Sequence, residues 1–431
     1  MAEMNFNEWY EPTPADWSIQ RMKNIMVPRD ERSAYGEEEL LSVTIHGGVI
    51  KRSEYIDEDE GTSRADSLVG YKIVSPTNLV NNIMKMSFRC LGVSAHEGIV
   101  SPAYSVFELN QSKVDHSYLN FLLRIDRYVA EYRKLSKGIQ ESRMRLYDDF
   151  FLAMKVIVPP LDEQKRISHY LDKKISQIDL LINKIEKKIK LLKEQRFSLI
   201  KHYVTKGLNS NEEMKESGVE WIGKVPKHWS IRRIKHIGNI KSGDGFKVEL
   251  QGNSSGEIPF YKVSDTNIEG NEKYLSTSNN YLSKFEVTEN RIRIFPKNTI
   301  LFPKIGAVLK LNKRRIAQCA CCVDNNMMGV TIESNDLPEF VYFFMTIVNF
   351  DLYCSDGTIP SISDSQVGRI DFVSPPISEQ KMILEILGTK LGTLDKIVSN
   401  VIRKKNALIE YRQSLISSLV SGKVRFTEDM V

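Results

Sequence analysis

The sequence predicts an α+β protein built as a tandem repeat, in which two globular mixed α/β domains are joined by two long helices. Two observations predict this fold: a pair of short motifs recurs at nearly the same offset, and a heptad pattern of apolar residues follows the second motif of each copy. A chain of 431 residues is long enough for two or three domains with cores of their own. We expect the two helices to form an antiparallel intramolecular coiled coil, which would give the repeat a pseudo-twofold arrangement.

The repeated motifs divide each copy into a framework and a variable part. PADWSIQRMKNI at residues 14–25 recurs as PKHWSIRRIKHI at residues 226–237, and PPLDEQK at residues 159–165 recurs as PPISEQK at residues 375–381. Between the motifs, residues 26–158 and 238–374 share a general strand-and-turn character but no extended identity. This pattern is expected of a duplicated scaffold that presents two different binding surfaces. Sequence drift after the duplication would leave the same pattern.

A long helix is predicted after each second motif. Residues 161–206 contain no Gly or Pro, and apolar side chains recur there in alternating steps of four and three, which is the spacing of a heptad seam. Arg196 interrupts this seam, and Lys405 and Arg412 interrupt the matching seam of the second copy. The apolar members are Leu171, Ile175, Ile178, Ile182, Ile185, Ile189, Leu192, Leu199 and Tyr203, then Leu387, Leu391, Leu394, Val398, Val401, Leu408, Leu415 and Leu419. A helix with a single apolar stripe needs a partner, and the matching helix of the same chain is the expected one.

Glycines mark the predicted ends of the helices. Gly207 and Gly422 are the predicted stop residues, and Gly388 and Gly392 are expected to loosen the start of the second helix. The chain then divides in order into a first globular domain at residues 1–160, a first central helix at 161–207, a second globular domain at 208–374, and a second central helix with a C-terminal tail at 375–431.

Both globular domains are predicted to mix strands and helices. Runs at residues 70–74 and 291–295 are rich in β-branched and aromatic residues and predict strands. The apolar spacing at residues 118–132 and 338–353 predicts helices. Pro, Gly, Asn and Ser punctuate the rest, which is typical of turns.

Charge and cysteine usage limit the class of protein. The net charge of +5 is mildly basic and permits a polyanionic partner, and residues 163–206 alone carry twelve Lys or Arg against five Asp or Glu. Five unevenly spread cysteines do not suggest a disulfide framework, which favours a reducing compartment and hence the cytoplasm. No stretch approaches the roughly 18 apolar residues of a membrane span, so we expect no membrane association.

Sequence patterns of catalytic or cofactor sites are incomplete. Residues 218–225 match the first seven positions of a phosphate-binding loop but end in Val225, where Ser or Thr would bind magnesium. Gly243 and Gly245 lack the third glycine of a dinucleotide fingerprint, so a turn is predicted there. We therefore expect no catalytic residue and no bound cofactor in this chain.

A cysteine cluster is the strongest candidate for a metal site. Cys319, Cys321 and Cys322 stand close together, but no second pair of ligands lies at zinc spacing and the flanking sequence alternates like a strand. We therefore expect buried cysteines and no metal site.

The repeated motifs resemble the specificity subunit of type I restriction-modification enzymes. The heptapeptides that begin at Trp17 and Trp229 resemble the starts of the family's two domains, and VPPLDEQ and SPPISEQ, ending at Gln164 and Gln380, resemble the starts of its central helices. LGVSAHEGIVSPAY at residues 91–104 resembles one common type of its target domain, whereas IKSG at residues 240–243 and GTIPSIS at residues 357–363 resemble another. The resemblance covers nearly the whole chain.

The resemblance implies a non-catalytic DNA-recognition subunit. Each globular domain would be a target-recognition domain that reads one half of a bipartite site in double-stranded DNA, and the helices would set the gap between the halves and bind two modification subunits. In the family, the modification subunits bind S-adenosylmethionine and methylate adenine, and restriction/translocase subunits supply ATP- and Mg-dependent translocation and cleavage. A helix of about 65 to 70 Å limits the spacing of the half-sites to about 20 base pairs.

Candidate DNA contacts follow from the side chains that DNA-binding proteins use. Lys and Arg bind phosphates and guanine edges, and hydroxyl side chains bind phosphates. In the first domain the candidates are Lys51, Arg52, Ser94, Ser101, Tyr104 and Arg143. In the second domain they are Lys241, Ser242, Lys247, Lys262, Lys304, Lys310 and Thr358. Taken singly, each is more often a solvated charge or a turn residue than a contact.

Two alternatives stay open from the sequence. The basic residues of the first helix fit a solvated coiled-coil face as well as a contact with DNA or a partner. The whole chain would also fit a non-catalytic coiled-coil interaction scaffold that does not read DNA sequence. Such a scaffold would show no salt-dependent affinity for duplex DNA.

Overall fold

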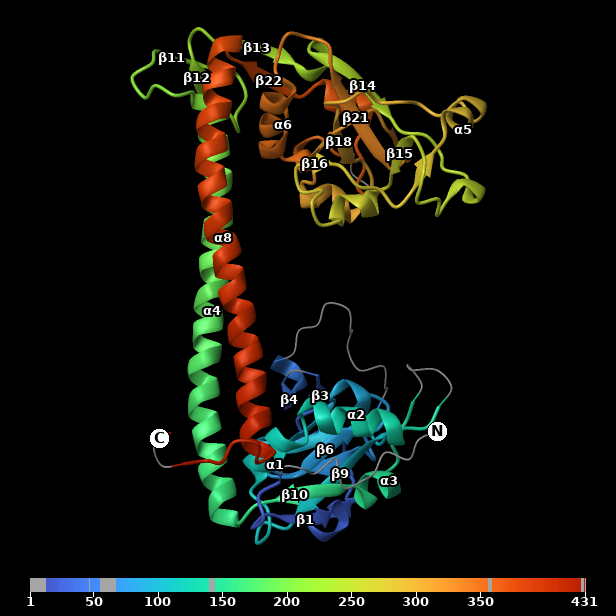
Figure 1. The fold of residues 1–431 in the computed structure, drawn as a ribbon, viewed down its shortest axis with the longest axis vertical. Coiled ribbons are helices and arrows are strands. Elements are labelled where there is room, and N and C mark those ends of the chain that lie inside the picture. The colour runs from blue at the N-terminus through green and yellow to red at the C-terminus, as the bar shows by residue number, and fades with distance from the viewer. Residues whose placement is uncertain are drawn as a thin grey trace. The chain divides into compact units, whose positions relative to one another are not determined.

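The computed structural model describes residues 13–45, 47–54, 67–138, 144–355, 359–427 and 430. The chain forms two compact units, of which unit 1 comprises Met1–Glu186 and Ile402–Val431, and unit 2 comprises Lys187–Val401 (Figure 1). Both long helices, α4 (Leu161–Lys206) and α8 (Ile377–Val420), run from one unit into the other. Each unit therefore contains one globular domain and a stretch of each helix.

The domain of unit 1 is built on a four-stranded antiparallel sheet in the order β2-β9-β6-β7. Three separate two-stranded sheets accompany it: the hairpin of β3 with β4, the pair of β5 with β8, and the pair of β1 with β10 where the domain meets α4. The elements are β1 (Ser18–Arg21), β2 (Met26–Arg29), β3 (Leu41–Thr44), β4 (Gly48–Lys51), β5 (Lys72–Val74), β6 (Leu79–Asn82), β7 (Leu91–Val93), β8 (Gly98–Val100), β9 (Tyr104–Leu109), α1 (His116–Leu122), α2 (Asp126–Leu135), α3 (Asp148–Ala153) and β10 (Lys155–Val158).

The predicted helix at residues 118–132 is divided in two. Asp115 caps α1 by accepting a hydrogen bond from the Tyr118 backbone N–H, and α2 begins at Asp126 after a short break. Tyr118, Tyr128 and Tyr132 from these helices are fully buried against the sheet. Two short helices that share one apolar face continue one spacing pattern, which is why the sequence did not reveal the break.

The domain of unit 2 contains a five-stranded sheet in the order β14-β21-β18-β19-β16 and a three-stranded sheet in the order β17-β15-β20. A hairpin of β11 with β12 precedes it, and β13 pairs with β22 as β1 pairs with β10 in unit 1. The elements are β11 (Met214–Glu216), β12 (Lys224–Pro226), β13 (Ser230–Arg233), β14 (Gly238–Ser242), β15 (Ile258–Tyr261), β16 (Tyr274–Leu275), β17 (Tyr281–Leu282), α5 (Lys284–Glu289), β18 (Ile300–Pro303), β19 (Arg315–Ala317), β20 (Cys322–Val323), β21 (Met327–Ile332), α6 (Pro338–Ile347), α7 (Asp364–Gly368) and β22 (Asp371–Ser374).

Two sequence predictions for unit 2 are wrong. Residues 291–295 form no strand, because Arg291 adopts a left-handed conformation (φ 53°) and the Arg293 backbone N–H donates to the Asp244 carboxylate rather than to a neighbouring strand. Cys321 and Cys322 are buried as expected, but Cys319 is exposed because it lies in the bend between β19 and β20. The helix predicted from residue 338 begins there, with Pro338 in its first turn.

The two long helices pack antiparallel in each unit, as predicted (Figure 1). The polar residues that interrupt their apolar seams form ion pairs with the opposite helix. In unit 1, Arg412 pairs with Asp179, and the Lys405 ammonium lies 2.6 Å from the Glu186 carboxylate. In unit 2, Arg196 lies 3.2 Å from a carboxylate oxygen of Asp395. Each basic side chain that would otherwise weaken the apolar seam is therefore neutralised by the opposite helix.

One of these ion pairs is itself repeated. When the two copies are aligned on their PPLDEQK and PPISEQK motifs, Arg412 corresponds to Arg196, and Asp395 corresponds to Asp179. The Asp179–Arg412 pair of unit 1 and the Arg196–Asp395 pair of unit 2 are therefore two copies of one interaction. Such pairs are half-exposed and contribute at most about 1 kcal/mol each, but they fix the register of the helices.

The repeated motifs of the sequence form the same contact in both units. The Trp17 indole N–H donates to the Glu163 carboxylate at 3.0 Å, and the Trp229 indole N–H donates to the Glu379 carboxylate at 3.0 Å. Both indoles are buried where a domain meets the start of a long helix. We call this contact the Trp–Glu clasp. Its duplication explains why the motifs at either end of each domain stayed alike.

The glutamine beside each clasp glutamate also has the same role twice. The Gln164 side-chain carbonyl accepts from the Asp115 backbone N–H at 2.8 Å, and that of Gln380 accepts from the Leu337 backbone N–H at 2.9 Å. Asp115 and Leu337 are the residues that precede α1 and α6. Each glutamine therefore ties the first turn of its long helix to a helix of the domain.

A buried carboxylate in unit 2 makes its stability dependent on pH. Burial alone would raise the pKa of Asp336, but hydrogen bonds from Ser334, Ser374 and Gln380 and the charge of Arg232 outweigh it and lower that pKa below its ordinary value. A group with a lowered folded-state pKa stabilises the fold above its unfolded pKa, and this stability is lost as the pH falls through the folded value. Unit 2 should therefore lose stability below about pH 4.

The prediction is tested with the variant Asp336→Asn. It should cost unit 2 about 1 to 3 kcal/mol at neutral pH and should remove part of the loss of stability on acidification. Hydrogen exchange of β13 and β22, followed from pH 6 to pH 3, measures the effect, with β1 and β10 of unit 1 as the internal reference. An unchanged acid dependence in the variant would contradict the assignment.

Two exposed glycines weaken α8. A Cβ atom added to Gly388 or Gly392 would meet no other atom within 4 Å, and both residues lie inside the helix. Glycine costs a helix interior about 1 kcal/mol relative to alanine. Gly388→Ala and Gly392→Ala should therefore each raise the stability of unit 2 by about 1 kcal/mol in thermal or denaturant unfolding. Gly252→Ala is the control with the opposite sign, because Gly252 has a left-handed φ of 85°.

Candidate DNA-binding surfaces

The β3–β4 hairpin carries two of the candidates in the first domain. Lys51 ends β4, its side chain is 40% exposed, and its ammonium lies 3.9 Å from the Glu54 carboxylate. Arg52 follows it, is half-buried, and donates its backbone N–H to the Leu40 carbonyl at 2.8 Å. Leu40 in turn bridges to Ile99. The hairpin therefore lies beside the segment 91–104, although the two are far apart in the sequence.

The remaining described candidates of the first domain lie in that segment. Ser94 is only 2% exposed, because its hydroxyl donates to the His96 carbonyl and accepts from the His96 backbone N–H in a tight turn. Ser101 lies in a second turn whose carbonyl accepts from the Tyr104 backbone N–H at 2.9 Å, and Tyr104 begins β9. Ser101 and Tyr104 are half-buried, so they present part of their side chains to solvent. Arg143 lies outside the described residues.

In the second domain the structure joins the two segments that carry the family resemblance. The Ser242 hydroxyl donates to the Asp364 carboxylate at 3.0 Å and accepts from the Lys304 ammonium at 2.8 Å. The Lys304 carbonyl accepts from the backbone N–H of Ile362 at 2.9 Å. Residues 240–243 and 359–363 therefore meet at Lys304, and Lys241 is exposed beside them. Thr358 lies outside the described residues.

Gly243 permits the close approach on which this cluster depends. A Cβ atom at this position would overlap the backbone carbonyl oxygens of Val323 and Asp324. Only glycine fits between β14 and the turn after β20, so the loop that follows Ser242 is held against the sheet. Burial raises the pKa of the Asp324 carboxyl on the other side of this contact.

The three other lysine candidates of the second domain lie outside the cluster around Ser242 and Lys304. The Lys262 ammonium donates to the Gln251 side chain at 2.6 Å and lies 5.2 Å from the centre of the Phe246 ring. Lys247, next to Phe246 in the chain, is exposed. Lys310 lies on a separate 3-10 helix, where its ammonium is 3.9 Å from the Asp351 carboxylate.

Sequence reasoning missed Arg293. Its guanidinium donates to the Ser242 carbonyl, and its backbone N–H donates to the Asp244 carboxylate at 2.7 Å. The residue falls in the strand predicted at 291–295, so its exposed position beside Ser242 could not be anticipated. The signal would have been the lack of strand pairing at Arg293, but a single sequence does not show which residues pair.

Two other kinds of site are absent from the part of the chain that the structure describes. Within the described ranges, no group of three His, Cys, Asp or Glu side chains is placed to hold a metal ion. None of the helices among those residues is both long enough and apolar enough to cross a membrane. The predicted absence of metal and of membrane association stays a prediction.

Comparison with known proteins connects this architecture to a family. The family model for the type I restriction modification DNA specificity domain matches residues 95–191 and 226–410, which is more than half of the chain. A Methanocaldococcus jannaschii protein assigned as the type I restriction enzyme MjaX specificity subunit is 22% identical over 96% of this chain and 94% of its own length. The MjaVIII specificity subunit of the same organism is 23% identical over 76% of this chain and 75% of its own length.

A solved structure from work on complex assembly and conformational transition of the type I R-M system has the same fold. It matches with a TM-score of 0.70 over 96% of this chain and 99% of that chain, at 14% sequence identity. The family model, the matching lengths of the relatives and the tandem fold agree with one another. The chain belongs to the type I restriction-modification DNA specificity family.

Proposed function

We propose that this chain is the DNA sequence-specificity subunit of a type I restriction-modification complex. Each globular domain is a target-recognition domain that reads one half of a bipartite site in double-stranded DNA. The paired helices separate the two halves and dock two modification subunits. The observation that supports this most directly is the contrast between the Trp–Glu clasp, which is the same in both units, and the candidate contact residues, which differ.

Under this proposal the chain itself performs no reaction. The modification subunits bring S-adenosylmethionine and methylate adenine, and the restriction/translocase subunits use ATP and Mg. The complex acts in the cytoplasm, for which the free cysteines are suitable because reduced thiols persist there.

The basic candidates bind the phosphate backbone, and the neighbouring polar groups read base edges. Lys241, Lys247 and Lys310 are exposed, so their ammonium groups can reach phosphates without a loss of internal packing. Ser242 and Lys304, which hydrogen-bond each other, are preorganised beside Lys241. Binding should weaken as salt rises, because each neutralised phosphate releases counterions.

Co-expression with a type I modification subunit from the same genome tests the proposal. Single-molecule sequencing of adenine methylation in the host DNA should show one split motif. Replacing residues 26–158 with the corresponding segment of another family member should change one half of the motif only. The matched exchange of residues 238–374 should change the other half only.

The alternative scaffold function predicts a different result. A stable complex with the modification subunit that methylates no defined motif would overturn sequence reading by this chain. Insensitivity of the complex to salt in duplex binding would point the same way.

A further inference from the structure

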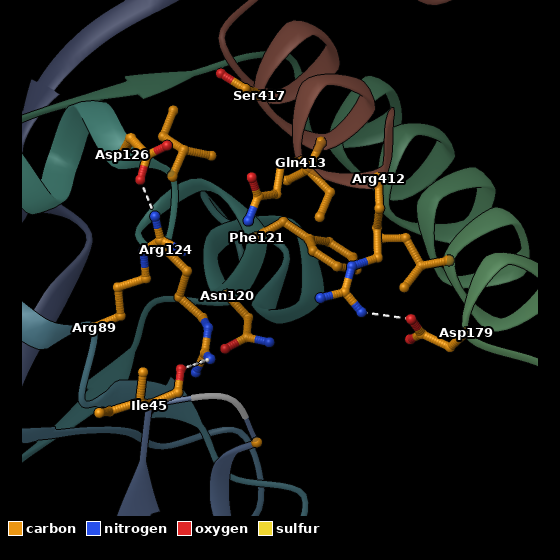
Figure 2. Close-up of a pocket in the computed structure, with 14 residues that line it drawn as sticks. Ile45, Arg89, Asn120, Phe121, Arg124, Asp126, Asp179, Arg412, Gln413 and Ser417 are labelled. Carbon is orange, nitrogen blue, oxygen red and sulfur yellow. Dashed lines mark hydrogen bonds and ion pairs between the residues drawn. The ribbon is translucent and has the colours of Figure 1, made fainter. Parts of the chain in front are cut away.

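Arg124 connects three parts of the first domain. It follows α1, and its guanidinium donates through Nη1 to the Leu91 carbonyl at 2.7 Å. Through Nη2 it donates to the Ile45 carbonyl at 2.8 Å (Figure 2). Leu91 begins β7, and Ile45 lies in the turn of the β3–β4 hairpin. Burial lowers the pKa of Arg124, because partial removal of the guanidinium from water disfavours its charged form.

Asn120 adds a second bond from the same side of α1. Its side-chain carbonyl accepts from the Val93 backbone N–H, at the end of β7, at 3.1 Å. Arg124 lies just beyond the end of α1, and because Asn120 bonds to Val93 and Arg124 bonds to Leu91, the two side chains approach β7 together. We call these two side chains the Asn120–Arg124 clamp.

Two glycines make room for the clamp. A Cβ atom at Gly48 would lie 2.9 Å from the Arg124 Nη1, and one at Gly92 would lie 3.0 Å from the Gly48 Cα and 3.4 Å from the Asn120 side-chain oxygen. Gly48 also has a left-handed φ of 69°. The hairpin and β7 therefore approach each other more closely than side chains would allow, and the guanidinium is seated against that contact.

The segments held by the clamp carry every described DNA-contact candidate of the first domain. The β3–β4 hairpin leads to Lys51 and Arg52, and β7 leads directly into the turns that contain Ser94 and Ser101. The strands of the hairpin and β7 do not pair with each other: β3 and β4 pair together, and β7 pairs with β6. The Leu40–Ile99 bridge joins the flank of the hairpin to the segment 91–104, but it does not reach β7 or the hairpin turn. The clamp supplies side-chain hydrogen bonds that reach both.

The clamp also faces the helix pair. Asn120 and Arg124 line a cavity of about 270 Å³ that is also lined by Asp179 of α4 and by Arg412 and Gln413 of α8 (Figure 2). The repeated ion pair of unit 1 therefore lies across the same cavity from the clamp. The clamp residues therefore lie between the β3–β4 hairpin and the helix pair of unit 1.

We propose that Asn120 and Arg124 are positioning residues for DNA recognition by the first domain. They hold the β3–β4 hairpin and the segment 91–104 in one relative arrangement, so that the contact residues of both segments reach the same half-site. They do so through backbone carbonyl and N–H groups and without contacting DNA themselves. This inference rests on the proposed function.

Methylation by the reconstituted complex with the modification subunit tests the clamp. The measurement is the ratio of methylation rates on the cognate duplex and on duplexes with single base-pair changes in either half. Arg124→Met should lower this ratio at least tenfold in the half read by the first domain and leave the other half unchanged. Arg124→Lys should restore part of the ratio, because an ammonium group can still donate to one of the two carbonyls.

Lys113→Met is the matched control. The Lys113 ammonium donates to the Asn24 backbone carbonyl at 2.9 Å, so it also ties two segments of unit 1 through a backbone carbonyl, and this hydrogen bond ends on neither the hairpin nor the segment 91–104. It should leave both ratios at the wild-type value. Asn120→Ala provides a milder second variant if Arg124→Met does not yield a folded complex, and it should shift the same half of the motif.

The outcomes separate the clamp from simpler roles. A lower melting temperature with an unchanged ratio in both halves would show a structural role only and overturn the inference. An equal fall in both halves would overturn it as well, because the clamp contacts the first domain alone. If the wild-type complex methylates no split motif, the proposed function fails, and this inference fails with it.

Discussion

Trp229→Ala is expected to destabilise unit 2 by about 3 to 5 kcal/mol, which is the usual cost of emptying a large buried aromatic site. Trp229 is fully buried at the point where β13, the end of α4 and the start of α8 meet. The variant also leaves the Glu379 carboxylate without the indole N–H that donates to it at 3.0 Å. Hydrogen exchange of β13 and β22 measures the change, because these strands should report opening of unit 2.

Trp17→Ala is the matched variant in the other copy. Trp17 makes the same hydrogen bond with Glu163 and is 6% exposed, so a similar loss is expected in β1 and β10 of unit 1. Each variant should leave the strands of the other unit protected. Equal loss of protection in both units from either variant would show that the clasps are not local and that the chain unfolds as one body.

Trp229→Phe separates the two contributions of the clasp. Phenylalanine fills most of the buried site but cannot donate to Glu379. A loss of about 0.5 to 1.5 kcal/mol is expected from the missing hydrogen bond, because His228 still lies 2.8 Å from that carboxylate. A loss as large as that of the alanine variant would mean that the hydrogen bond outweighs the packing.

The fold could be predicted from the sequence wherever one physical requirement occurs twice. The Trp–Glu clasp needs an indole before β1 or β13 and a carboxylate after a Pro-Pro pair, and this need preserved both motifs through the duplication. The heptad seam was visible for the same reason. What the sequence could not show was that Arg196 and Arg412 have partners, because each carboxylate lies on the other helix, far away in the sequence.

The candidate surfaces were less predictable because their geometry depends on backbone groups. Arg124 bonds to two carbonyl oxygens, and a carbonyl oxygen is present at every residue, so no side chain in the sequence marks the partner. Ser94 shows the same dependence on backbone groups: its hydroxyl donates to the His96 carbonyl and accepts from the His96 backbone N–H, so it is buried in a turn that the sequence did not reveal. The DNA contacts of both domains stay predictions.

Gly422→Ala is expected to cost unit 1 about 2 to 4 kcal/mol and to release the C-terminal tail, because a strained backbone conformation and a steric overlap add together. Gly422 ends α8 with a left-handed φ of 75°, a conformation that costs a residue with a Cβ atom about 1 to 2 kcal/mol. A Cβ atom there would also overlap the Pro14 ring and lie 3.0 Å from the Trp17 indole, and such overpacking costs about 1 to 3 kcal/mol.

The residues that follow Gly422 contact the Trp–Glu clasp of the first domain. Arg425 pairs with Asp16 and lies 3.1 Å from the Glu163 carboxylate, so it adds to the clasp of the first domain.

Gly218→Ala is the control, because Gly218 also has a left-handed φ, of 73°, but no atom lies within 4 Å of the added Cβ. Only the conformational cost of about 1 to 2 kcal/mol is therefore expected. Limited proteolysis after residue 422 and hydrogen exchange of β1 and β10 should both increase in Gly422→Ala alone. If the two variants behave alike, the contact of the helix end with Pro14 and Trp17 contributes nothing, and the first domain is held by the clasp without help from the C-terminal end.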